Sequence, residues 1–248
     1  MPVLRSPRSA VAWPLSSRPT GAYPVTALSH SLVEGTPAPM QLPYAHGQAG
    51  VPLAVPDAPA DADVLARTGF ATRADLGQHF LRSPEVARRL LECAALPTGA
   101  QVLEVGAGLG TLSCAVVQAG CRIWAVEKDV RLGTLLLDKL RPFGPRARVT
   151  IADVRSVDLD GGLERGSVLL AILPFDWELS SALTEHIFAS THNVVRGLVV
   201  IPSRTLDQYR AAEGEGRGLR LEEVDGISRR EFWPQAPAPL RVVSIERR

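Results

Sequence analysis

Three glycines at alternate positions, Gly106, Gly108 and Gly110, follow a short apolar run in the stretch VLEVGAGLG (102–110). Glycines in such a turn allow positive φ angles and let the backbone approach a ligand that a Cβ would keep away. A dinucleotide-binding turn would carry another glycine where this chain has Thr111. The spacing G-x-G-x-G therefore favours a nucleoside with a short cationic tail over a pyrophosphate. An ordinary strand-to-helix turn is the alternative.

Acidic residues also stand at the ends of the next two apolar runs. Glu127 follows WAV and Asp153 follows TIA, and Glu104 precedes the glycine turn. Open parallel sheets bind ligands at the carboxyl ends of their strands, where a carboxylate can accept both hydroxyls of a ribose. We expect Glu127 to do so, and Asp153 to accept a hydrogen bond from the exocyclic amine of an adenine. Each acid alone would more simply cap a helix or face solvent, but together with the glycine turn they predict an adenosyl ligand.

Alternating strands and helices must position these residues. Apolar runs predict strands, and helical spacing with caps such as Ser83 ahead of Pro84 predicts helices. The expected strands are 100–106, 122–129, 147–153, 167–175 and 195–203, and the expected helices are 83–96, 111–120, 130–144, 180–190 and part of 206–218. Residues 219–225 and 240–248 are expected to form a closing antiparallel pair. This order predicts an α/β, Rossmann-like, mostly parallel sheet with helices on both faces.

Composition divides the chain into three segments. Residues 1–60 hold eleven of the 20 prolines, so we expect a disordered Pro/Ala-rich segment. A start codon assigned upstream of the natural one would give a segment of the same composition. Residues 61–205 are expected to form the ligand-binding core, and residues 206–248 a shortened C-terminal region with the closing strands.

Charge and cysteine usage restrict the location and the partners. The net charge of +1 gives no overall basic field, which counts against a nucleic-acid partner. The three cysteines show no paired metal-ligand spacing, which fits a reducing compartment and predicts no metal site. No apolar stretch approaches the roughly 20 residues of a membrane span, and the N-terminus lacks the apolar core of a signal peptide. We therefore expect a cytoplasmic protein without a membrane partner.

LGQHFL (76–81), followed in order by VLEVGAGLGTLS, AVEKD, IAD and a strand ending in LPF, resembles the ribosomal RNA adenine N6-dimethyltransferase family. That family includes the small-subunit dimethyladenosine transferases and the macrolide-resistance methyltransferases. The resemblance covers roughly residues 76–205. It implies a class I methyltransferase fold, S-adenosylmethionine as cofactor and ribosomal RNA as acceptor. It also implies that Gln78, His79 and Leu81 help hold the methionine part of the cofactor, along with Gly106.

The strand ending in LPF carries the implied catalytic residues, Leu173, Pro174 and Phe175. By the resemblance, a carbonyl beside the proline accepts from the target amine and the Phe175 ring stacks on an extruded adenine. The family has an asparagine where this chain has Ile172, so one polar acceptor is missing. With the neutral charge and the short C-terminal region, this leaves a second hypothesis open: a repurposed fold that acts on a small natural product, or a cofactor-binding module.

Overall fold

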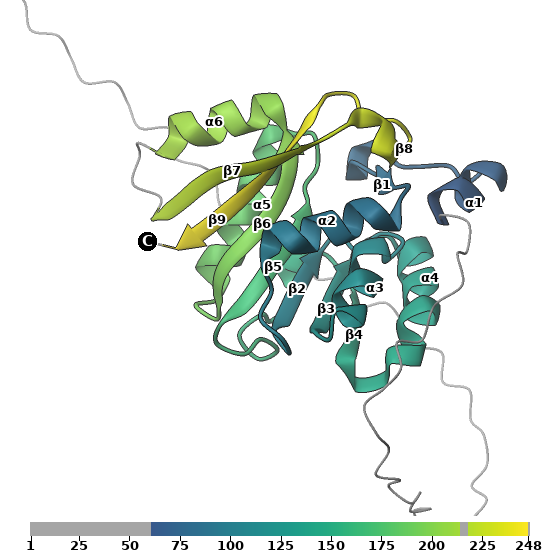
Figure 1. The fold of residues 1–248 in the computed structure, drawn as a ribbon, viewed down its shortest axis with the longest axis horizontal. Coiled ribbons are helices and arrows are strands. Elements are labelled where there is room, and N and C mark those ends of the chain that lie inside the picture. Colours follow the sequence, from purple (N-terminus) through teal and green to yellow (C-terminus); the bar gives the residue numbers. More distant parts are fainter. Residues whose placement is uncertain (1–60, 214–217, 248) are drawn as a thin grey trace, which may run out of the picture. The chain divides into compact units, whose positions relative to one another are not determined.

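The computed structural model describes residues 61–213 and 218–247, so the segment expected to be disordered, residues 1–60, lies outside the described residues. Its centre is a seven-stranded sheet (Figure 1). The strands in spatial order are β4 (Ala147–Ile151), β3 (Arg122–Glu127), β2 (Gln101–Val105), β5 (Ser167–Ile172), β6 (Val194–Pro202), β9 (Leu240–Arg247) and β7 (Leu219–Ile227). The first five strands in this order, from β4 through β3, β2 and β5 to β6, run parallel, and β9 runs antiparallel to both of its neighbours. The predicted mostly parallel sheet and the closing antiparallel pair are confirmed.

Helices cover both faces of this sheet, as predicted. They are α2 (Pro84–Ala94), α3 (Thr111–Gln118) and α4 (Val130–Leu140) on one face, and α5 (Trp177–Ser190) and α6 (Ser203–Glu213) on the other. Successive strand residues point to opposite faces, so Val102 packs in the first core and Leu103 in the second. Because both faces are covered, the central strands are mostly apolar instead of alternating with polar residues.

The start of each helix follows from its capping residue. The Ser83 hydroxyl accepts from the Glu85 N–H at 3.1 Å, with Pro84 at the first helical position, as predicted. Helix α5 begins three residues earlier than expected, because the Asp176 side chain accepts from the Leu179 N–H at 2.8 Å and caps it. The preceding strand ends at Ile172, short of the predicted 175.

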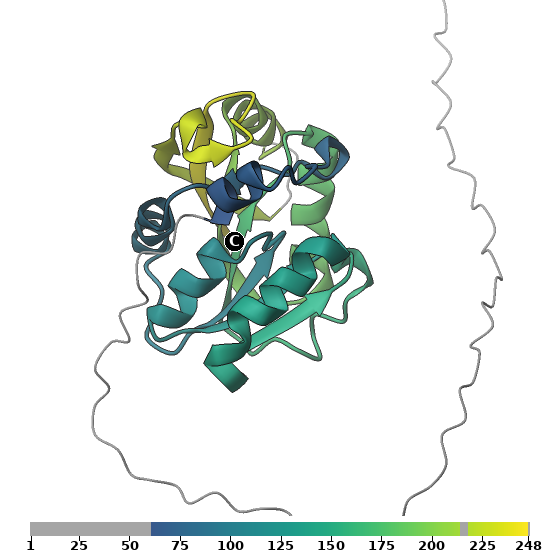
Figure 2. The same ribbon diagram turned by 90° about the vertical axis from the view of Figure 1, so that its right-hand side faces the viewer.

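A small second sheet, absent from the sequence expectations, joins distant parts of the chain. Strand β1 (Phe80–Leu81) pairs antiparallel with β8 (Phe232–Trp233), after the short helix α1 (Asp61–Arg67). The rings of Phe80 and Trp233 stack with centroids 6.1 Å apart. Figure 2 shows this N-terminal segment, in blue, next to the closing segment, in yellow. The pairing fixes the LGQHFL stretch beside the main sheet.

Within the ranges 61–213 and 218–247, no helix combines the length and the apolar character needed to cross a membrane.

Candidate active site

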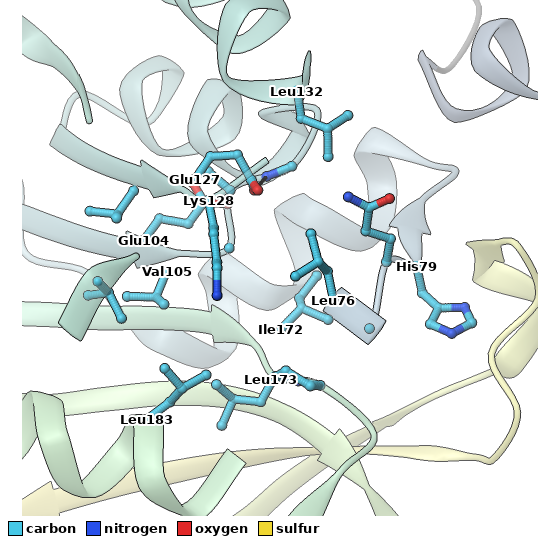
Figure 3. A pocket seen from close by; sticks show the side chains of 18 of the residues that line it. Leu76, His79, Glu104, Val105, Glu127, Lys128, Leu132, Ile172, Leu173 and Leu183 are labelled. Atoms are coloured by element: carbon cyan, nitrogen blue, oxygen red, sulfur yellow. Dashed lines mark hydrogen bonds between the residues drawn. The ribbon is translucent and has the colours of Figure 1, made fainter. Parts of the chain in front are cut away.

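A pocket of about 180 Å³ lies at the carboxyl ends of β2, β3, β4 and β5. Figure 3 shows Glu104, Glu127 and Lys128 on one side of it and Leu173 and Leu183 on the other. Nine of the eleven residues predicted for the site line the pocket: Gln78, His79, Leu81, Gly106, Gly108, Glu127, Asp153, Leu173 and Pro174. Two of them, Gly110 and Phe175, do not line it.

The glycine turn has the backbone conformation that its spacing predicts. Gly106, Gly108 and Gly110 have φ angles of 74°, 54° and 70°. A Cβ at Gly110 would come within 2.5 Å of the Leu136 side chain, so this glycine lets α4 pack against the turn. It also forms the N-cap of α3. Gly110 thus has a packing role, and its predicted contact with a ligand stays a prediction. A Cβ at Gly108 would meet the Phe80 ring at 3.2 Å, which places the LGQHFL stretch directly over the turn.

Glu127 joins the glycine turn to the end of β3. Its two carboxylate oxygens accept backbone N–H bonds, one from Gly108 and one from Asp129, both at 2.7 Å. Burial raises the pKa of Glu127, and the backbone hydrogen bonds oppose that rise. Each carboxylate oxygen has a second lone pair, so the group can still accept from the hydroxyls of a ligand.

Asp153 stands at the mouth of the pocket beyond β4. Its carboxylate accepts from the Arg155 N–H at 3.0 Å and pairs with the Arg155 guanidinium at 2.6 Å and with Lys128 Nζ at 3.0 Å. The Arg155 side chain chiefly holds the pKa of Asp153 well below its usual range, with Lys128 contributing. Asp153 thus serves as a turn cap inside an ion-pair cluster. Its predicted bond to an adenine amine stays a prediction.

Glu104, the acid that precedes the glycine turn, also lines the pocket. Only 4% of it is exposed, and the Ser113 hydroxyl donates to its carboxyl group. Burial raises the pKa of Glu104 to about 8, and the charge of Glu127 adds to this rise. A cation in the pocket would favour the ionised form of Glu104, because opposite charges stabilise each other at short range. An acid inside an otherwise apolar strand is the sequence signal for this role.

The LGQHFL stretch forms a wall of the pocket through contacts of its own side chains. Gln78 donates to Asp129 Oδ2 at 2.7 Å and accepts from the Arg73 N–H at 2.8 Å. His79 Nδ1 lies 2.8 Å from the Pro234 carbonyl oxygen. Leu81 is buried in the main core. These bonds hold the segment in place. The predicted contacts of Gln78, His79 and Leu81 with a ligand remain predictions.

The end of β5 closes the pocket on its apolar side. Ile172 and Leu173 line it, together with Leu179 and Leu183 of α5. The buried hydroxyl of Ser180 donates to the Pro174 carbonyl at 2.6 Å. That carbonyl therefore already has one hydrogen-bond partner.

Phe175 does not line the pocket. Its ring meets the His79 ring edge-on, with centroids 4.8 Å apart, and it lines a separate hollow nearby. The ring thus lies next to a residue that lines the pocket, and its predicted stacking on an acceptor base stays a prediction.

The charged groups of the pocket are of both signs. Glu104, Glu127 and Asp153 come from the ends of three neighbouring strands, and the lining residues Lys128 and Arg155 both pair with Asp153. In the part of the chain that the structure describes, no three His, Cys, Asp or Glu side chains gather as a metal site would require.

The sequence matches a known family model and several related proteins. The model for "Ribosomal RNA adenine dimethylase" matches residues 69–221. Relatives named "Ribosomal RNA small subunit methyltransferase A" include one from Opitutus terrae, 42% identical over 34% of this chain and 30% of that protein. Another, from Leifsonia xyli, is 28% identical over 75% of this chain and 70% of that protein. In the Opitutus relative the matched part thus spans well under two thirds of the protein.

Solved structures share the fold. The 23S rRNA methyltransferase ErmE superposes with a TM-score of 0.53 at 23% identity, over 68% of this chain and 70% of that one. A dimethyladenosine transferase from Plasmodium falciparum gives a TM-score of 0.57 at 15% identity, over 68% of this chain and 63% of that one. The predicted Rossmann-like class I methyltransferase fold is confirmed.

Proposed function

The chain belongs to the ribosomal RNA adenine dimethylase family, and on that premise we propose that it transfers methyl groups from S-adenosylmethionine to the N6 amine of an adenine in ribosomal RNA. One observation carries the proposal: three carboxyl groups and a positive-φ glycine turn meet in one pocket at the ends of β2, β3 and β4. The family also favours ribosomal RNA over the small natural product that the sequence left open.

The residues of the pocket fit S-adenosylmethionine by their chemistry. Glu127 has lone pairs for ribose hydroxyls, and Asp153 is an ionised acceptor for an adenine amine. The positive-φ turn at Gly106 exposes backbone where a Cβ would otherwise stand. Burial raises the pKa of Glu104 to about 8, and the positive charge of a bound sulfonium would favour its ionised form. We assign Gln78, His79 and Leu81 to the wall beside the methionine part.

The cofactor supplies a methyl group that its sulfonium has already activated, so the protein has to orient and desolvate the acceptor. The apolar side of the pocket, with Ile172 and Leu183, excludes water from the acceptor. Ile172 offers no hydrogen-bond acceptor, and the Pro174 carbonyl already accepts from Ser180. We therefore assign the contact with the target amine to the Leu173 carbonyl, and the stacking on the acceptor base to Phe175.

Ribosomal RNA as the acceptor also implies where the protein works. We propose that it acts in the compartment that holds ribosomes, the cytoplasm. The net charge of +1 means that RNA contacts must come from local groups and not from an overall field.

The test is methyl transfer with labelled S-adenosylmethionine. The full chain is incubated with unmethylated total ribosomal RNA and, in parallel, with a metabolite extract, and the labelled products are identified as nucleosides or small molecules by mass spectrometry. The proposal predicts labelled N6-methyladenosine or N6,N6-dimethyladenosine in the RNA. A label found only in a small molecule would replace it with the small-acceptor hypothesis.

A further inference from the structure

A second hollow lies beside the pocket, where the chain leaves β5. It is lined by Phe175, Asp176, Trp177, Arg204 and Gln208. Pro174 lines the pocket and the next residue lines the hollow, so the two spaces adjoin along the chain. An RNA strand whose acceptor base enters the pocket at Pro174 brings an adjoining nucleotide towards this hollow.

Trp177 offers a fixed aromatic face there. Its ring meets the Tyr209 ring edge-on, with centroids 4.8 Å apart. Tyr209 is itself buried, and its hydroxyl donates to the Ser180 carbonyl at 3.0 Å. The buried Tyr209 therefore holds the Trp177 indole in place. Unpaired RNA bases stack on aromatic side chains of this kind, and a ring already held in place loses little conformational entropy on binding.

Arg204 supplies the charge of the hollow. Its guanidinium is exposed and donates to the Phe175 carbonyl at 3.1 Å. Among the described residues, no carboxylate forms an ion pair with it within 4.0 Å. The acid of the hollow, Asp176, accepts the N–H of Leu179 at the start of α5. Arg204 thus keeps free N–H donors in the fork geometry that suits a phosphate.

We propose that Trp177, Arg204 and Gln208 form a subsite for the nucleotide next to the acceptor adenosine. The base lies on the Trp177 ring, its phosphate pairs with Arg204, and the exposed amide of Gln208 faces the base edge. This inference rests on the proposed function, because it takes RNA as the acceptor. It explains how a chain of nearly neutral net charge contacts RNA close to its reaction centre.

Fluorescence anisotropy with a labelled single-stranded RNA fragment tests the subsite without methyl transfer. Arg204→Gln should weaken the Kd about tenfold and lower the slope of log Kd against log salt by about 0.7, the effect of one lost phosphate contact. Trp177→Leu should weaken the Kd about tenfold and leave the slope unchanged. The matched control is Arg210→Gln, on the helix α6 that also carries Arg204. Arg210 pairs with Glu223 at 3.2 Å, and the variant should bind RNA as wild type does.

Calorimetric affinity for S-adenosylhomocysteine should be the same in all four proteins. Wild-type Kd and salt slope in Arg204→Gln would overturn the subsite, as would a wild-type protein that binds no RNA. If Trp177→Leu lowers the thermal midpoint strongly, the exposed Arg204 decides the question alone. A wild type that binds RNA through Arg204 yet methylates none would contradict the proposed function and leave the subsite standing.

Discussion

Gly77 lies directly against Pro174: a Cβ placed on Gly77 would come within 3.0 Å of the Pro174 Cβ. Two stretches almost a hundred residues apart thus touch at the pocket, one from LGQHFL and one from the end of β5. Two residues after Gly77 and one residue after Pro174, the His79 ring meets the Phe175 ring edge-on. The LGQHFL stretch and the end of β5 therefore pack directly against each other.

Gly77→Ala should disturb this contact. Its φ of 64° is unfavourable for alanine, and the new methyl group would push against Pro174. We expect a loss of about 1 kcal/mol or more in the free energy of unfolding and a fall in kcat for methyl transfer. Urea unfolding and initial rates measure the two effects.

The control for this variant is Gly69→Ala. Gly69 has a similar φ of 71°, and nothing lies within 4 Å of its added Cβ. It should lose a similar amount of stability through backbone strain and keep its kcat. An equal fall of kcat in both variants would contradict the role of the Gly77 contact.

Glu104 should make the protein less stable as the pH rises. Its pKa is raised by burial from 4.5 to about 8, so the folded state binds its proton more tightly than the unfolded state does. The stabilisation of the folded state by this tighter proton binding is fully present below about pH 4.5 and is lost as the pH rises through about 8. Between pH 6 and pH 8 the wild type should lose roughly 1–3 kcal/mol of unfolding free energy relative to Glu104→Gln, which keeps an acceptor for Ser113. Parallel pH dependence of the two proteins in urea unfolding would contradict this pKa.

Ile172→Asn should raise the rate of methylation on RNA. The substitution restores the amide oxygen that the family resemblance implies at this position, and one positioned polar contact at a reacting group can change a rate by about 10². Ile172→Leu, which keeps an apolar side chain, should stay near the wild-type rate. Initial rates on ribosomal RNA decide the matter: loss of activity in Ile172→Asn, with retention in Ile172→Leu, would show a pocket adapted to an apolar environment.

The sequence predicts well what is encoded locally. The alternation of apolar runs and capped helices predicted the order of strands and helices along the chain and a mostly parallel sheet, and the spacing of Gly106 and Gly108 predicted their turn. The carboxyls of Glu127 and Asp153 were placed correctly because strand ends of a parallel sheet share one edge.

Local sequence patterns could not predict contacts between distant segments. The pairing of Phe80 with Trp233 joins strands of two residues each, too short to show periodicity. Gly110 resembles its neighbours in the motif, and its packing against Leu136 of α4 shows only in the structure. The early start of α5 depends on its cap Asp176, which the sequence places between the expected strand and helix without identifying it as a cap.

The proposed methyl transfer requires that the pocket holds S-adenosylmethionine, and titration calorimetry of the full chain with S-adenosylhomocysteine measures this directly. We predict micromolar binding by the wild type. Glu127→Ala should weaken it by roughly 1–3 kcal/mol, because the ligand hydroxyls and the Gly108 N–H lose a buried acceptor. Glu164→Ala, which removes an exposed carboxylate paired with Arg122, should bind as wild type does. No detectable binding to a folded wild type at millimolar ligand would contradict the account.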